Sequence, residues 1–220
     1  MNNANLKQQE ELHEIKQMME RSSRFVSLSG LSGIAAGICA LVGDYFAGNI
    51  INESFGGRIP DLESSLYIRY NGNQMSLTDL LANKLMQIAI LTFLAALISS
   101  FIFTFLRSKT TNVSVWGTTS KRLFINLSIP LIMGGFFLLK LIQLGIIGLI
   151  APGCLIFYGL ALVNASKYTL NEIRYLGYFQ LLLGIINLFI IGKGILLWGI
   201  GFGALHIVYG LVMWLKYERQ

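Results

Sequence analysis

Apolar stretches long enough to cross a lipid bilayer recur along this chain of 220 residues. A membrane hydrocarbon core is about 30 Å thick and an α-helix rises about 1.5 Å per residue, so about 20 apolar residues can cross it. Only 13% of the residues are charged, against about 25% in ordinary soluble domains. That share is too small to cover a water-facing surface. The chain is therefore predicted to be an all-α polytopic membrane protein whose main partner is the lipid bilayer.

Six transmembrane helices are predicted from the lengths of the apolar stretches. They lie at about 25–47, 83–106, 123–140, 144–164, 176–192 and 195–215. The links between the third and fourth spans, and between the fifth and sixth, are very short, so each of these pairs is predicted to form an antiparallel hairpin. The chain divides into an N-terminal segment, residues 1–24, and a six-helix transmembrane domain, residues 25–220.

The N-terminal segment is predicted to form an amphipathic helix over residues 6–21. Leu12, Ile15 and Met19 fall at helical spacing on one face, and the other positions are mostly charged or polar. This segment is too polar to span a bilayer. Three uses stay open for it: lying on the membrane surface, pairing with a copy of itself, or docking a soluble partner.

The sizeable loop on the outer side, residues 48–80, contains a turn signal. Asn71 and Gly72 stand between two short runs, and this dipeptide favours a type I′ turn because both central positions need positive φ. A short β-hairpin is predicted there.

Lys and Arg are distributed unevenly between the two sides of the predicted bundle. Of the 17 in the chain, 12 fall on the side of both termini and 5 on the other. Because positive charge concentrates in cytoplasmic loops, both termini are predicted to be cytoplasmic. This bias also accounts for the net charge of +6 without a nucleic-acid partner.

Small residues repeat every four positions in the first span, at Ser29, Gly33 and Gly37. This spacing lets a second helix approach closely, as small residues do in membrane helix pairs. The second helix either belongs to the same bundle or to another copy of the chain.

The last two spans each carry small and polar residues on one face. They are Gly177, Gln180, Gly184 and Asn187 in the fifth span and Gly199, Gly203, His206 and Gly210 in the sixth. Folding this hairpin near residue 193 places Gly184 opposite Gly203 and brings Gln180 within reach of His206. Polar residues at membrane depth need partners and often mark a function. Two interpretations stay open: a packing role, or a ligand, proton or ion site formed by His206, Gln180 and Asn187.

Two further patterns concern the second half of the chain. Pro152 is expected near the middle of the fourth span, where a proline kinks or breaks the helix. Such a break either lines a transport site or reflects only that proline is common in membrane helices. The Tyr-Gly pairs at 158–159 and 209–210 are followed by Lys-Tyr at similar distances. The third and fourth spans therefore either form a hairpin that is repeated by the fifth and sixth, or share with it only the residues common at membrane interfaces.

No catalytic residue, metal site or cofactor is predicted. Only two histidines occur, on different segments, and no two carboxylates share a span. A membrane enzyme needs at least two converging reactive groups, so the chain is predicted not to be an enzyme. Cys39 and Cys154 lie in apolar spans and are expected to be free thiols.

Three stretches carry a resemblance: MERSSRFVSLSGLSGIAAGI at 19–38, IFYGLALVNASKYTLNEIRYLG at 156–177 and GFGALHIVYGLVMWLKYER at 201–219. In these the chain resembles a family of uncharacterised bacterial six-span integral membrane proteins. The resemblance implies a bacterial inner membrane and transfers no functional residue. Two functions are therefore expected as alternatives. One is a non-enzymatic sensor, anchor or accessory subunit acting through the N-terminal helix on a protein partner. The other is a small permease or channel with its site around His206.

Overall fold

The computed structural model of the chain describes residues 29–55, 81–111, 117–190 and 192–219, and all elements in these ranges are helices. The longer ones are α2 (Gly30–Phe55), α5 (Lys84–Thr111), α6 (Thr118–Gln143), α7 (Ile150–Ala165), α8 (Glu172–Phe189) and α10 (Leu205–Tyr217). The short ones are η1 (Ile147–Leu149), η2 (Ser166–Tyr168), α9 (Gly194–Trp198) and the π-helical segment η3 (Gly199–Ala204). The predicted N-terminal helix and the predicted hairpin at Asn71 and Gly72 lie outside the described residues.

Five helical segments are long and apolar enough to cross a membrane. They are Gly30–Glu53, Lys84–Thr110, Thr118–Gln143, Ile147–Tyr168 and Gly194–Tyr217. The last of these joins α9, η3 and α10 into one continuous helix, which we call the final rod. Helix α8 is not among the five, because its 18 residues include Glu172 and Arg174 as well as two buried amides. The prediction of an all-helical membrane protein is confirmed for the described part of the chain.

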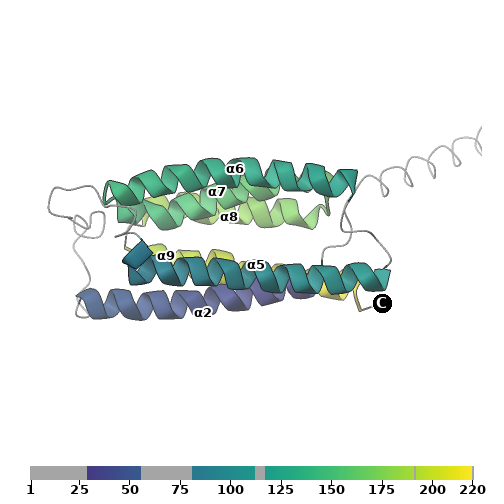
Figure 1. The fold of residues 1–220 in the computed structure, drawn as a ribbon, viewed down its shortest axis with the longest axis horizontal. Coiled ribbons are helices and arrows are strands. Elements are labelled where there is room, and N and C mark those ends of the chain that lie inside the picture. Colours follow the sequence, from purple (N-terminus) through teal and green to yellow (C-terminus); the bar gives the residue numbers. More distant parts are fainter. Residues whose placement is uncertain (1–28, 56–80, 112–116, 191, 220) are drawn as a thin grey trace, which may run out of the picture.

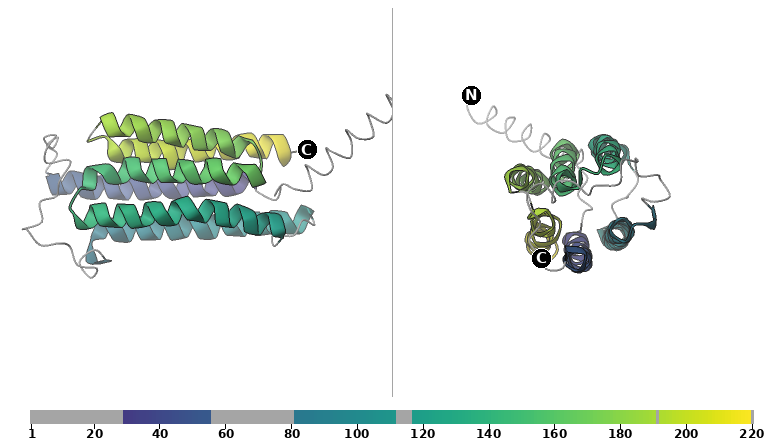
Figure 2. Two further views of the ribbon diagram at one scale, coloured as in Figure 1. Left: turned by 90° about the horizontal axis from the view of Figure 1, so that it is seen from above. Right: turned by 90° about the vertical axis from the view of Figure 1, so that its left-hand side faces the viewer.

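The helices form two layers. Helices α6, α7 and α8 make one layer, with α7 in the middle, and α5, α2 and the final rod make the other, with α2 in the middle (Figures 1 and 2). The layers meet where α7 and α8 contact the final rod. Because neighbouring helices are mostly antiparallel, the start of α2 and the end of α10 lie at the same end of the bundle.

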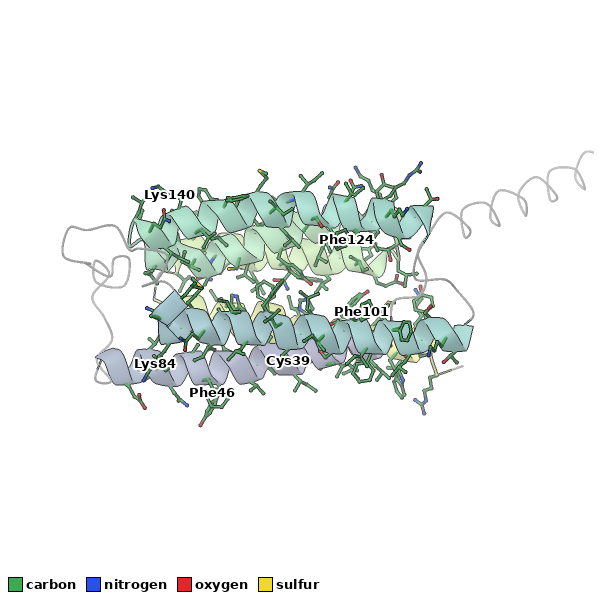
Figure 3. All side chains as sticks on the ribbon, in the orientation of Figure 1. Cys39, Phe46, Lys84, Phe101, Phe124 and Lys140 are labelled. Carbon is green, nitrogen blue, oxygen red and sulfur yellow. The ribbon has the colours of Figure 1, made fainter. Side chains whose placement is uncertain are left out.

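The outer surface of the bundle is apolar. Phe46 projects away from the bundle on α2 (Figure 3), and Phe46, Phe101 and Phe124 are each more than half exposed. Lys84 of α5 and Lys140 of α6 are in different layers but at the same end of the bundle, the end away from the start of α2. Aromatic side chains along the flanks with lysines at an end are what a bilayer-embedded bundle requires.

Two of the differences between the observed and the predicted helix boundaries matter for the interpretation. Helix α2 continues to Phe55, well past the predicted end at 47. Helix α7 begins at Ile150, after the short helix η1, so Pro152 lies in its first turn and not in its middle. Backbone N–H groups in the first turn of a helix have no hydrogen-bond acceptor within that helix. A proline there, which has no N–H, therefore breaks no helical hydrogen bond. The predicted break in the fourth span is therefore wrong.

The idea of a repeated hairpin is also not supported by the packing. Helix α6 packs along α7, but α8 packs mainly on α7 and the final rod packs mainly on α2. The last two helices contact each other over a shorter stretch, so they do not form a second close hairpin of the same kind.

Cys39 and Cys154 are free thiols.

Candidate functional site

Glycines of the final rod lie against α2. A Cβ atom added at Gly37 would lie 2.7 Å from the Gly203 carbonyl oxygen, and one added at Gly210 would lie 2.6 Å from the Gly30 carbonyl oxygen. Only glycine allows backbones to approach this closely. Gly33 belongs to the same face, since its added Cβ would be 3.2 Å from the Gly210 Cα. The small-residue face of α2 is thus used inside the bundle.

Glycines of α8 lie against α7 and not against the final rod. A Cβ at Gly177 would lie 3.0 Å from the Gly159 carbonyl oxygen, and one at Gly184 would lie 2.6 Å from the Ile156 side chain. The predicted contact between Gly184 and Gly203 is therefore wrong. Glycine spacing predicts that a helix will approach closely but does not identify that helix, and here each of the two glycine faces has a different partner.

Ser29 and Gly199 lie at opposite ends of the contact between α2 and the final rod. Ser29 is 4% exposed and donates a 3.3 Å hydrogen bond to a carboxylate oxygen of Glu218. Gly199 lies beside Asp44, because an added Cβ would be 2.6 Å from an Asp44 carboxylate oxygen. The contact therefore runs along α2 from its first residues to Asp44.

The carbonyl oxygen of Gly201 is the centre of a buried polar cluster. It accepts a 2.8 Å hydrogen bond from the Gln180 side-chain amide of α8 and lies 3.0 Å from the His206 Nδ1 atom. Because a carbonyl can only accept, Nδ1 carries the proton. Gln180 and His206 do meet as predicted, but through this shared carbonyl and not through a bond to each other.

Tyr158 of α7 completes the cluster on the other side of the imidazole ring. Its hydroxyl lies 2.8 Å from His206 Nε2, and in the neutral ring this nitrogen is an acceptor, so the hydroxyl donates. Phe202 packs against both rings, and its ring centroid lies 4.9 Å from that of Tyr158 and 6.0 Å from that of His206. We call Tyr158, Gln180, Gly201 and His206 the polar hub.

The local sequence explains how the hub can form. Residues 199–204, GIGFGA, adopt a π-helix, a rare form that often marks functional sites. An added Cβ at Gly201 would lie 2.8 Å from Gln180 Oε1, so the missing side chain lets the amide reach the backbone. Three glycines in six residues therefore allow both the unusual helix and the close approach of α8.

Two buried atoms near the hub lack a hydrogen-bond partner in the described part of the chain, Gln180 Oε1 and Asn187 Nδ2. Gln180 is 0% exposed and Asn187 is 2% exposed. They are seven residues apart on one face of α8, which is about 10 Å along the helix. One atom accepts hydrogen bonds and the other donates them, and an unpaired buried polar atom costs about 1–3 kcal/mol.

The hub is made of polar groups that donate and accept hydrogen bonds. It offers amides, a hydroxyl, a carbonyl and one neutral imidazole. Among the described residues, no group of three or more His, Cys, Asp or Glu side chains is placed to hold a metal ion. Such a set can bind a small polar molecule, exchange a proton at the imidazole, or hold helices in register.

Tyr158 and Gly201 were not identified as site residues from the sequence. The signals were present, since Tyr158 lies in an apolar span and Gly201 lies within GIGFGA, but neither pattern shows which side chains meet.

No protein-family model, no curated protein and no solved structure matches this chain.

Proposed function

We propose that this chain is an integral protein of the bacterial inner (plasma) membrane that crosses it six times, with both termini in the cytoplasm. Helix α8 is the additional span: it lies beside α7 along the bundle and has a mainly apolar sequence. The excess of Lys and Arg on the side of both termini supports the orientation. The resemblance to bacterial membrane proteins supports the location.

We propose further that the protein is a non-enzymatic sensor, anchor or accessory subunit that acts on a protein partner through its N-terminal segment. One observation carries this proposal. Helix α10 includes His206 of the polar hub, and Glu218, directly after its last residue, contacts Ser29 and Gly30. Four residues, 25–28, separate them from the N-terminal segment, residues 1–24. Helix α10 therefore runs from the buried polar site to the start of α2.

Deleting residues 1–20 is expected to remove bound proteins without unfolding the bundle. The measurement is capture of the full-length protein and the truncated form from native membranes in mild detergent, followed by mass spectrometry. Proteins that need the amphipathic helix should be enriched at least tenfold with the full-length form. A matched control keeps the length and replaces Leu12, Ile15 and Met19 by serine, which removes only the apolar face. Equal recovery of the same proteins with all three forms would contradict the proposal.

A second function is supported by a separate observation, the two unpaired atoms on α8. A small permease or channel needs hydrogen-bonding groups at membrane depth that are available to a solute. Gln180 Oε1 and Asn187 Nδ2 meet this description, and His206 lies beside Gln180 at the shared carbonyl. The solute would be small and would both donate and accept hydrogen bonds.

If the permease function is correct, His206→Leu and Asn187→Leu should each abolish the thermal stabilisation produced by a transported solute. At a concentration of 100 Kd, a ligand stabilises its protein by about 2.7 kcal/mol, which a melting curve resolves. Asn126→Leu is the control, because Asn126 lies on α6 and its amide bonds to the Arg122 carbonyl. A broad screen of metabolites that shifts no melting curve of the wild-type protein would count against transport.

A further inference from the structure

The carboxylate of Glu218 joins three separate helices at the end of the bundle where the chain enters and leaves it. One oxygen lies 2.7 Å from Arg107 Nη1 of α5 and also accepts from the Gly30 backbone amide of α2. The other oxygen accepts from the Ser29 hydroxyl at 3.3 Å. A second guanidinium nitrogen of Arg107 donates to the Tyr217 carbonyl at 3.1 Å. We call Glu218, Arg107, Ser29 and Gly30 the terminal latch.

The latch places one negative charge between two positive partners. The amides of the first turn of α2 form the positive end of that helix, and Arg107 brings a full positive charge. The side chains of Arg107 and Glu218 are 14% and 11% exposed, so water screens them weakly. Removing the carboxylate would leave Arg107 facing the positive end of α2. This arrangement makes the latch sensitive to the loss of a single charge.

The latch lies at a close contact between the backbones of α2 and α10. A Cβ added at Gly30 would clash with the backbone at Gly210 and Trp214. The start of α2 therefore has no room to shift while α10 stays in place. The described part of the chain begins at Ser29, four residues after the N-terminal segment, so any displacement of Ser29 must first break the bonds of Glu218.

We propose that Glu218 is a releasable latch that couples the N-terminal segment to α10 and thereby regulates when that segment is available to its partner. With the latch closed, Ser29 and the first turn of α2 are held against α10. With the latch open, Ser29 and the first turn of α2 are released from α10. The regulatory role rests on the proposed function of the N-terminal segment, whereas the latch itself rests only on the contacts above.

The test is hydrogen–deuterium exchange of full-length Glu218→Gln protein in lipid nanodiscs, together with trypsin cleavage after Arg21 and Arg24. Losing a helix cap of about 1 kcal/mol corresponds to roughly a fivefold change in local opening. Exchange in the first turn of α2, and cleavage after Arg21 and Arg24, should each become about five times faster. Exchange in α6, α7 and α8 should not change.

The matched control is Glu172→Gln at the same end of the bundle. Glu172 accepts from Lys216 Nζ at 2.5 Å and from the Tyr217 hydroxyl at 2.9 Å. The change therefore removes a comparable paired carboxylate that does not touch α2. It should leave both readouts at the start of the chain unchanged.

Three results would overturn the latch. The first is an unchanged exchange rate at the start of α2 in the Glu218→Gln protein. The second is faster exchange there without faster cleavage. The third is faster exchange in every helix, which would make Glu218 a purely structural residue. If Glu218→Gln does not fold, Glu218→Asp is the second variant: its side chain is too short to keep the hydrogen bonds to Ser29 and Gly30. It must show the same local pattern, or the latch is rejected. None of these results depends on capturing a partner, so the latch and the proposed function can fail separately.

Discussion

Gly210→Ala is expected to destabilise the bundle by about 1–3 kcal/mol, the range typical of overpacked positions. The reason lies in what surrounds the missing side chain. An added Cβ would lie 2.6 Å from both the Gly30 carbonyl oxygen and the Ile34 amide nitrogen of α2. Backbone atoms cannot rotate away as a side chain can, so the two helices must separate. The measurement is reversible unfolding in mixed micelles, with the midpoint compared between variant and wild type.

The matched control for this change is Gly135→Ala in α6. An added Cβ there meets no atom within 4 Å. Alanine is the better helix former by about 0.8–1 kcal/mol, so this variant should be as stable as the wild type or more stable. Equal behaviour of the two variants would show that the close contact of α10 with α2 does not hold the bundle together.

The course of the membrane helices was predictable because bilayer thickness sets a minimum length for each span. The five long apolar helices correspond to five of the predicted stretches. Their ends were less predictable. Helix α2 continues past its apolar part, and Pro152 looks the same in a sequence at the start of a helix as in its middle. An apolar stretch indicates which residues can lie inside a membrane, but it does not indicate the exact residue where a helix begins.

The arrangement around the site was only partly predictable, since spacing identifies faces and not partners. The faces of Gln180 and His206 were identified, and these side chains do lie together. Their connection depends on the Gly201 carbonyl, which the π-helical segment presents, and a heptad or helical-wheel pattern assumes a regular α-helix. The latch was missed for a different reason: Glu218 and Gly30 are 188 residues apart, and a single acidic residue after the last helix is otherwise unremarkable.

The imidazole of His206 is expected to be coupled energetically to the hydroxyl of Tyr158. Tyr158→Phe removes the donor to Nε2, and His206→Leu removes both the acceptor for Tyr158 and a donor to Gly201. Each single change leaves a buried polar atom without its partner and should cost about 1–3 kcal/mol of unfolding free energy. The double variant leaves neither atom of the Tyr158–His206 bond unpaired. It should therefore lose less than the sum of the two single changes.

The size of that difference measures the bond itself. Hydrogen bonds between membrane helices contribute about 0.6–2 kcal/mol in comparable cycles, so a coupling in this range is expected from unfolding in mixed micelles. The control cycle uses Tyr175→Phe with His206→Leu, because Tyr175 is 63% exposed on α8 and should be additive with His206. If the two changes in the Tyr158 cycle are additive within about 0.5 kcal/mol, the 2.8 Å contact between Tyr158 and His206 contributes no measurable free energy of unfolding. The polar hub would then consist of separate groups, and the coupling of His206 to α7 would have to be abandoned.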